Sequence, residues 1–422
     1  MNRREFGRLV ALTGSAAFVP PAALKGLTSA RLQAPPAEPT EAYWRDVRAR
    51  FLLPRDVTFL NAANLCPASL PSIEAMSRNV RQYEADPSPE FRAALMARGR
   101  EEVRRALTRA LRVTPEEVVI TRNTTEGNNV VSSGLDLRSG DEVVVWEDNH
   151  PSNLNAWRLK AQRFGFSVTA VPVPASHPGT DGYVELFTKA FTPRTRLVAI
   201  THVSSNSGDL LPAAEICAAA RSRGILSLVD GAQAFGVLDL DLGRINPDFY
   251  TGSMSKWPCG PKEKGLLFVN KQAHGRIHPS VVGVYPGAVG ISRTLESHGQ
   301  RDDAAVAAVV EALQFQDTIG RDRIEKRSRD LAQALITGLR NVNGVRMWTD
   351  GNPERSAAIV VFRPGTLDIR KLGAALTRDK IICTTRTGTH NPGLRMAPHF
   401  FNTMEDIDRA VAAIRKYAAA GV

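Results

Sequence analysis

Asp230 and Lys256 are two residues whose types and placement can do chemistry at the edge of a sheet. Asp230 ends the apolar run 226–229, and Lys256 follows a second block that begins at Asp248. A short apolar run bounded by turn residues is typical of a buried strand in a parallel sheet, and residues 265–269 predict a further strand of this kind. Ligands of open α/β sheets lie outside the carboxyl ends of the strands. We therefore expect the carboxylate and the amine to face one site.

One cofactor, pyridoxal 5'-phosphate (PLP), needs this pair of groups. A lysine holds PLP as a Schiff base, and an aspartate commonly partners the nitrogen of its ring. The lysine must lose its proton to attack an aldehyde, and desolvation or a cationic neighbour lowers its pKa enough. Taken alone, Asp230 is equally well explained as a cap at the end of a strand, and Lys256 as a lysine in a surface loop. The two together, with a strand pattern around both, favour the cofactor.

Separate motifs along the chain fall in the order that is found in one enzyme family. Asp230-Gly-Ala-Gln233, followed by Ser253-x-Ser255-Lys256-Trp257, resembles the class V aminotransferase-type PLP enzymes. This family includes isopenicillin N epimerase-like proteins, cysteine desulfurases and kynureninases. The resemblance extends from about Asn61 to Ala413. It implies an α/β protein with the PLP-dependent transferase (aspartate aminotransferase-like) fold: a mostly parallel sheet with helices on both faces, and a smaller C-terminal α/β domain.

Three parts of the chain are expected from its patterns. Residues 1–40 form an export signal and linker, 41–300 a large PLP-binding domain with an N-terminal helical segment, and 301–422 a linking helix and a small α/β domain. Helical spacing is seen in residues 41–53, 72–111 with a break at 86–89, 304–339 and 406–418. Further strands are predicted at 118–121, 143–146, 197–201 and 357–362.

The resemblance assigns one group of residues to the cofactor. A strand followed by small hydroxylated residues and a helix start directs backbone N–H groups towards an anion, although an ordinary helix cap has the same pattern. His150 would stack on the ring, and Gln233 could donate to its phenolate oxygen. Ser205 stands where relatives often have Asn, which leaves open whether Ser205 or Asn206 contacts the cofactor. The cofactor-binding residues implied in this way are Thr124, Thr125, Glu126, His150, Ser205, Asp230, Gln233, Ser253, Ser255, Lys256 and Gln300.

Other residues are assigned by the resemblance to the substrate. Arg395 matches the arginine that grips the α-carboxylate in relatives, and a guanidinium fork suits a carboxylate through two parallel hydrogen bonds. A surface salt bridge is the alternative. Arg386 is a second candidate, and Asn61 belongs to a segment near the substrate.

A common first step leaves several reactions open. With Asp230 and His150 as the other catalytic residues, Lys256 would remove the Cα proton of an amino acid or amino-acid-containing compound as a general base. We expect an aminotransferase or an epimerase-like enzyme. Cysteine desulfurases carry a cysteine in the loop that corresponds to residues 387–394, and this loop has none, although Cys383 precedes it. A PLP-dependent lyase or desulfurase-like activity, or a non-catalytic PLP-fold binding protein, is the alternative.

Other classes of protein are disfavoured. No GxGxxG motif follows an early strand, as a Rossmann dehydrogenase requires. The net charge of +11 lies partly in the first 31 residues, without a basic run interleaved with aromatics, so we expect a basic solvated surface and no nucleic-acid partner. The four cysteines form no CxxC pair, so no metal site is expected.

The N-terminus predicts export. Arg3-Arg4 and the apolar run 9–18 resemble a twin-arginine signal, with cleavage between Ala23 and Ala34. The expected location is the periplasm, with no membrane association beyond export. Residues 295–302 resemble a segment that crosses a dimer interface, which implies a homodimer with shared active sites.

Overall fold

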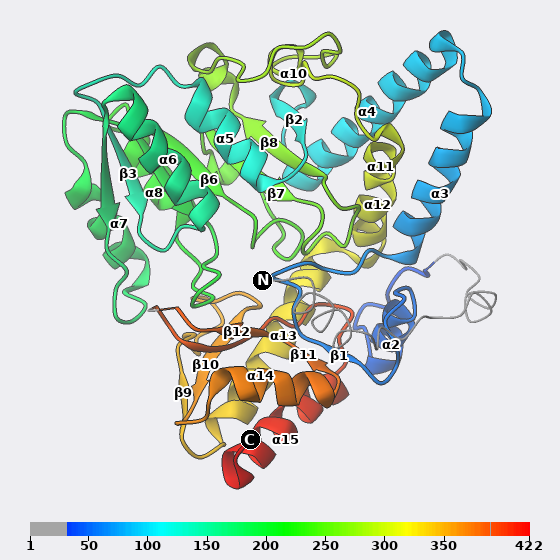
Figure 1. Cartoon of the computed structure of the whole chain (residues 1–422), viewed down its shortest axis with the longest axis vertical. Helices are drawn as coiled ribbons and strands as arrows, with labels where there is room; N and C mark the ends of the chain where they lie inside the picture. Colours follow the sequence, from blue (N-terminus) through cyan, green and yellow to red (C-terminus); the bar gives the residue numbers. More distant parts are fainter. Residues whose placement is uncertain (1–31, 389) are drawn as a thin grey trace, which may run out of the picture. The chain divides into compact units, whose positions relative to one another are not determined.

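A seven-stranded sheet organises most of the chain in this computed structural model, which describes residues 32–388 and 390–422. The twin-arginine motif lies outside the described residues. The strand order is β2-β8-β7-β6-β5-β3-β4 (Figure 1). Its strands are β2 (Val118–Thr121), β3 (Glu142–Trp146), β4 (Ser167–Val171), β5 (Thr195–Thr201), β6 (Leu226–Asp230), β7 (Phe249–Ser253) and β8 (Gly265–Val269).

The sheet is mostly parallel, as expected, but β8 is antiparallel to both of its neighbours. Strands β4, β3, β5, β6 and β7 pair in parallel. The expectation of a parallel strand at 265–269 is therefore wrong in direction. A parallel pair needs a crossover, usually a helix, whereas antiparallel neighbours can be joined by a turn. Residues 254–264, between β7 and β8, contain turns and no helix.

Helices cover both faces of the sheet. They include α5 (Thr124–Gly134), α6 (Pro151–Phe164), α7 (Gly179–Ala190) and α8 (Ala213–Arg221). Successive side chains of a strand point to opposite faces. In β3, Val143 and Val145 join one apolar core with α5 and α6, while Val144 and Trp146 join another with α7 and α8. This confirms the two-faced packing that the sequence predicts.

Two groups of helices flank these layers. The first is a pair, α3 (Leu70–Ala85) and α4 (Pro89–Leu111), with the break that the prolines predict. The second is the run α11 (Asp303–Ala307), α12 (Val309–Ile319) and α13 (Arg321–Arg340). The expected single helix at 304–339 is interrupted at Ala308 and at Gly320, where φ is 95°. Such a backbone conformation is accessible to glycine and ends the helix. Figure 1 shows α4 beside α11 and α12.

The C-terminal part contains a four-stranded antiparallel sheet in the order β12-β13-β10-β9. Its elements are β9 (Val345–Met347), β10 (Val360–Pro364), β12 (Thr384–Arg386), β13 (Gly393–Met396), α14 (Ile369–Arg378) and α15 (Met404–Ala420). A short parallel pair joins β1 (Thr58–Phe59) to β11 (Ile381–Ile382). The chain therefore returns at its C-terminal end to the segment that precedes α3.

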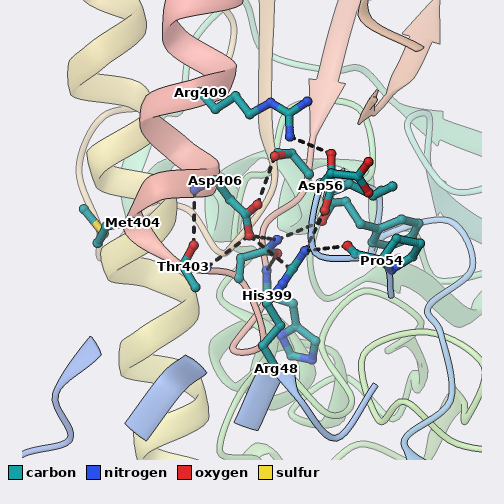
Figure 2. A network of polar contacts seen from close by, with 12 residues as sticks. Arg48, Pro54, Asp56, His399, Thr403, Met404, Asp406 and Arg409 are labelled. Atoms are coloured by element: carbon teal, nitrogen blue, oxygen red, sulfur yellow. Dashed lines mark hydrogen bonds and ion pairs between the residues drawn. The ribbon is translucent and has the colours of Figure 1, made fainter. Parts of the chain in front are cut away.

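A buried carboxylate, Asp406, holds this return in place (Figure 2). Arg48, at the end of α2 (Glu41–Arg48), donates to Asp406 Oδ2 at 3.2 Å, and Thr58 Oγ1 donates to Oδ1 at 2.9 Å. Asn402 Nδ2 donates to Oδ2 at 3.0 Å, and Asp406 forms a capping box with Thr403 at the start of α15. Among the described residues, no helix is both long and apolar enough to cross a membrane.

Candidate active site

The carboxyl ends of β6 and β7 bring Asp230 into a buried, hydrogen-bonded position. Asp230 pairs with Thr251 of β7 in the parallel register, and its residue is 2% exposed. Its Oδ2 accepts a hydrogen bond from Asn128 Nδ2 at 2.8 Å, and its Oδ1 accepts one from the Ala232 amide at 3.0 Å. A carboxylate with a donor on each oxygen has a fixed orientation. The sequence-based placement of Asp230 at a strand end is therefore found in the structure.

Asn128 is a site residue that the sequence reasoning missed. It lies in α5 and is fully buried. Its Oδ1 accepts from Thr251 Oγ1 at 2.9 Å, which directs its amide nitrogen towards Asp230. The available signal was its spacing: Asn128 follows Thr124 by four residues, and residues at that distance share one face of a helix.

The start of α5 meets the end of β7 through hydroxyl groups. Thr124 Oγ1 and Ser253 Oγ are 2.9 Å apart, and the Thr124 amide donates to Ser253 Oγ at 3.0 Å. Thr125 occupies the next position of the first turn. The first N–H groups of a helix lack intrahelical acceptors and carry the positive end of its dipole. These features together suit a phosphate group.

Glu126 lies in the same turn but faces a different partner. Its Oε1 accepts from Arg122 Nε at 3.2 Å, and its amide donates to Asn123 Oδ1 at 2.9 Å. Asn123 is thus the N-cap of α5. Glu126 therefore contributes to the cap in this structure, and its carboxylate is engaged by a cation.

Lys256 follows β7 in a tight turn, which contacts the segment around Cys66. Ser255, just before it, accepts at its carbonyl from the Cys66 amide at 2.8 Å. Burial lowers the pKa of Lys256 to about 8; the nearby Asp230 charge raises this pKa, and the Arg395 charge lowers it. A substantial fraction of the amine is therefore neutral near pH 8 and able to attack a carbonyl carbon.

His150 belongs to the same electrostatic group. It is the N-cap of α6, and its Nδ1 lies 2.8 Å from Ser152 Oγ. Loss of hydration lowers its pKa, the Lys256 and Arg395 charges lower it further, and the Asp230 charge raises it. The lowered pKa favours the neutral ring, which is exposed on this chain just beyond the end of β3. This position is consistent with the expected stacking role.

Two arginines of the small antiparallel sheet, Arg386 and Arg395, form no ion pair with a carboxylate among the residues that the structure describes. Arg395 is 7% exposed and makes only long contacts to neutral oxygens, at 3.4 Å to Ser205 O and to Thr384 Oγ1. Burial and the Arg386 charge lower its pKa to about 10. The Nε–H groups of Arg386 and Arg395 are buried without an acceptor in the described part of the chain. An unpaired buried guanidinium is costly, so this pair is suited to an anionic ligand.

Two other predicted residues, Gln233 and Asn61, have side-chain contacts within the protein. Gln233 donates from Nε2 to Ala63 O and accepts at Oε1 from Trp257 Nε1, both at 2.9 Å. One N–H of its amide is thus occupied by the protein. Asn61 Oδ1 accepts from Thr384 Oγ1 at 2.6 Å, next to Arg395.

Asp148 contacts Asn206, which is one of the two residues expected to contact the cofactor. The Asn206 amide donates to the buried Asp148 carboxylate, and Ser204 Oγ donates to it at 2.6 Å. Burial raises the pKa of Asp148, while the Arg386 charge lowers it. Asp148 thus occupies one of the two N–H groups of the Asn206 amide, and both Ser205 and Asn206 stay candidates for a cofactor contact.

Gln300 lies at the surface of the described part of the chain. It is exposed and forms no hydrogen bond to the other candidate residues within the described part of this chain. The segment before it is anchored by a fully buried ion pair, in which Arg104 Nη1 lies 2.8 Å from Glu296 Oε1.

The donors present fit PLP. Arg395 supplies an unpartnered buried N–H for a substrate carboxylate, and the hydroxyls of Thr124 and Ser253 converge at a helix start. Asp230 is positioned to accept from a protonated ring nitrogen, and Lys256 supplies an amine with a lowered pKa.

Comparisons with known proteins identify the family of this chain. The family model for aminotransferase class-V matches residues 61–410. Isopenicillin N epimerase of Amycolatopsis lactamdurans is 31% identical over 392 residues, which covers 88% of this chain and 98% of that protein. A probable cysteine desulfurase of Methanothermobacter thermautotrophicus is 26% identical over 403 residues, covering 89% and 98%.

Solved structures show the same fold. A mutant of C-DES with glycine covalently linked to its PLP cofactor aligns with a TM-score of 0.82 and 25% identity, covering 87% of this chain and 98% of that one. C-DES, described as a cystine C–S lyase, in complex with cysteine persulfide aligns with a TM-score of 0.79 and 26% identity, covering 86% and 98%. Together with the match over residues 61–410, these similarities show that the chain belongs to the class V aminotransferase family of PLP-dependent enzymes.

Proposed function

We propose that this enzyme acts at the α-carbon of an amino acid or amino-acid-containing compound, with Lys256 as the cofactor-attaching residue and proton carrier. The carrying observation is that Lys256 lies in the turn after β7, the strand that pairs with β6 at the buried Asp230 carboxylate. Burial lowers the pKa of its amine to about 8, and the charges of Asp230 and Arg395 both act on this pKa. A base with a pKa close to the working pH is effective in proton transfer.

Each residue then has a defined task. When bound, PLP supplies an aldehyde and an electron-withdrawing ring that stabilises negative charge at the substrate carbon. Asp230, oriented by Asn128, holds the proton on the ring nitrogen, and Thr124 and Ser253 bind the phosphate. Arg395 grips the α-carboxylate, and the freed amine of Lys256 takes and returns the Cα proton.

An epimerase-like or aminotransferase reaction is the first candidate for the activity of this enzyme. The isopenicillin N epimerases of two actinomycetes are each 31% identical to this chain, and each is covered over 98% of its length. Residues 387–394 contain no cysteine, which disfavours a desulfurase that uses a thiol in this loop. We do not propose the β-lactam substrate of the named epimerases as the substrate of this enzyme.

A C–S lyase is the second candidate. The observation in its favour is the structural similarity to C-DES, a named cystine C–S lyase, at TM-scores of 0.82 and 0.79. Elimination shares the Cα deprotonation by Lys256 and differs in the departure of a group from the β-carbon. Elimination needs no thiol in the loop 387–394 when the sulfur departs as part of the group that leaves the β-carbon.

Isotope exchange separates these reactions. We would incubate the PLP-loaded protein with L- and D-amino acids, including cystine, in deuterated water. Deuterium at Cα with inversion supports the epimerase, a keto acid with aminated cofactor supports the aminotransferase, and a released sulfur species supports the lyase. Lys256→Ala should lose every activity. Absence of all three products from the wild-type protein across the panel contradicts the proposal.

Export to the periplasm remains a proposal that rests on Arg3-Arg4 and the apolar run after it. The twin-arginine route carries folded proteins, which suits an enzyme that takes up PLP before export. Replacing both arginines with lysine should leave the protein in the cytoplasm, as measured by fractionation. Periplasmic recovery of this variant would contradict the proposal.

We also propose a homodimer in which Gln300 reaches the phosphate end of the neighbouring site. Gln300 is exposed, and the loop packed against its segment exposes apolar side chains: Val282 is 85% exposed and Val284 76%. Exposed apolar clusters mark interaction surfaces. Val282→Asp/Val284→Asp should shift the mass in solution from dimer to monomer, and a monomeric wild-type protein would contradict the proposal.

A further inference from the structure

Two cysteines that are 193 positions apart in sequence meet beside the lysine turn. Cys66 Sγ and Cys259 Sγ are 3.5 Å apart, and both residues are buried. The other two cysteines, Cys217 and Cys383, are also free thiols. Cys66 and Cys259 form no local motif, so the close pair could not be predicted from the sequence.

The backbone fixes both thiols relative to Lys256. The Cys66 amide donates to Ser255 O at 2.8 Å, and the Cys259 amide donates to Lys256 O at 3.0 Å. Cys259 has φ of 55°, a left-handed conformation that residues with a side chain seldom adopt. Such strain persists where the surroundings hold it, often at functional turns. The Lys256 turn and the segment 61–66 are thus joined at the point where the two sulfur atoms face each other.

We propose that Cys66 and Cys259 are a redox-active pair that closes to a disulfide and restrains the Lys256 turn against the segment 61–66. The pair would report the thiol–disulfide state of the compartment in which the enzyme works. This inference concerns a modification of the protein itself and does not depend on which reaction the enzyme catalyses.

The chemistry balances with a small-molecule or protein disulfide as the oxidant. The Cys66 thiolate attacks one sulfur of the oxidant and releases the other as a thiol, which leaves a mixed disulfide. The Cys259 thiolate then attacks Cys66 Sγ and releases the second thiol. Two thiols of this chain are thereby oxidised, one external disulfide is reduced to two thiols, and their protons pass to the released groups.

Access favours Cys66 as the first nucleophile. It directly follows Asn64 and Leu65, which are exposed, so a small opening of this segment reaches its thiol. Lys262 donates from Nζ to the Cys66 carbonyl and brings a cation beside both sulfurs. Burial raises the pKa of Cys259. Cys259 is therefore the less reactive thiol, and we expect it to react second, with the mixed disulfide at Cys66. Thiolate character controls the reactivity of cysteines.

Thiol counting in the PLP-loaded, full-length protein tests the pair. One sample is equilibrated in glutathione buffers from reduced to oxidised, and a second is produced in an oxidising compartment so that the bond can form before burial. Each is unfolded, alkylated and mapped by mass spectrometry. We expect the four thiols of the sequence in the reduced form. In the oxidised form, Cys66 and Cys259 should appear in one linked peptide pair, and Tm should rise by about 3–6 °C.

Matched variants separate this pair from the remaining thiols. Cys66→Ala and Cys259→Ala should each abolish the linked peptide and the rise in Tm, whereas Cys217→Ala and Cys383→Ala should keep both. Amide hydrogen exchange at residues 61–69 and 255–260 should slow on oxidation. Four alkylatable thiols in both oxidised samples, or a link between other cysteines, overturns the pair. A link without slower exchange overturns its restraining role.

Discussion

At the scale of single residues, burial and neighbouring charge set the pH at which Lys256 loses its proton. Its pKa is lowered to about 8, mainly by burial, with Asp230 raising and Arg395 lowering it. Below this pH the ammonium form dominates, and above it the free amine does. In the cofactor-free protein, labelling of Lys256 by an amine-specific reagent should therefore rise with a midpoint near pH 8, against about 10.4 for a lysine in a model peptide.

Two substitutions should move this midpoint in opposite directions. Arg395→Gln removes a like charge and should raise the midpoint, while Asp230→Asn removes an opposite charge and should lower it. Peptide mapping of the labelled protein across the pH series measures both shifts. Equal midpoints in the wild type and both variants would contradict the electrostatic account of the site.

Asn128 gives a second prediction at this scale. Asn128→Ala removes the donor to Asp230 Oδ2 and the acceptor for Thr251 Oγ1. A hydrogen bond to a charged group contributes about 1.5–3 kcal/mol, so the Kd for PLP should rise about 10- to 100-fold. Asn129→Ala is the matched control, because the neighbouring amide donates to Thr125 O on the exposed side of α5. Titration of the apoprotein with PLP measures both, and an unchanged Kd for Asn128→Ala would count against the orienting role.

At the scale of elements, the sequence pattern predicted strands accurately where an apolar run ends at a polar or turn residue. The strand expected at 118–121 is β2 to the residue, and the run 226–229 becomes β6 with Asp230 as its last residue. The direction of β8 and the break at Gly320 were not predicted, because both depend on how the chain packs after it turns. Asn128 and the Cys66–Cys259 pair were missed for a related reason: the partners of these residues are distant in sequence.

The close packing of β6 against β7 makes Gly231 sensitive to substitution. A Cβ at Gly231 would lie 2.2 Å from Tyr250 Cε1, inside a fully buried part of the sheet. Gly231→Ala must therefore displace the Tyr250 ring or the strand end that carries Asp230. Overpacking of this kind costs about 1–3 kcal/mol. Chemical denaturation should show that loss together with weaker PLP binding, whereas Gly275→Ala, where a Cβ meets no atom within 4 Å, should show neither.

At the scale of the whole molecule, the segment that precedes the large sheet depends on the C-terminal helix. Asp406 accepts hydrogen bonds from Arg48, Thr58 and Asn402, so one carboxylate joins α2, β1 and the start of α15 (Figure 2). The chain continues from β1 directly to Asn61, whose side chain meets Thr384 beside Arg395. The position of the substrate-binding arginine is thus connected to both ends of the described chain.

Asp406→Asn should destabilise this connection strongly. It removes one partner of a largely buried ion pair, whose side chains are 12% exposed for Arg48 and 9% for Asp406, and it turns an amide nitrogen towards other donors. Leaving a buried charge unpaired costs about 3–5 kcal/mol. Asp408→Asn, an exposed change in the same helix, is the control. Denaturant unfolding measures the loss, and limited proteolysis should cut first between α2 and α3, because that segment loses its anchor while β6 and β7 keep their own packing. Equal unfolding free energies for the two variants would show that the C-terminal helix does not hold the N-terminal segment.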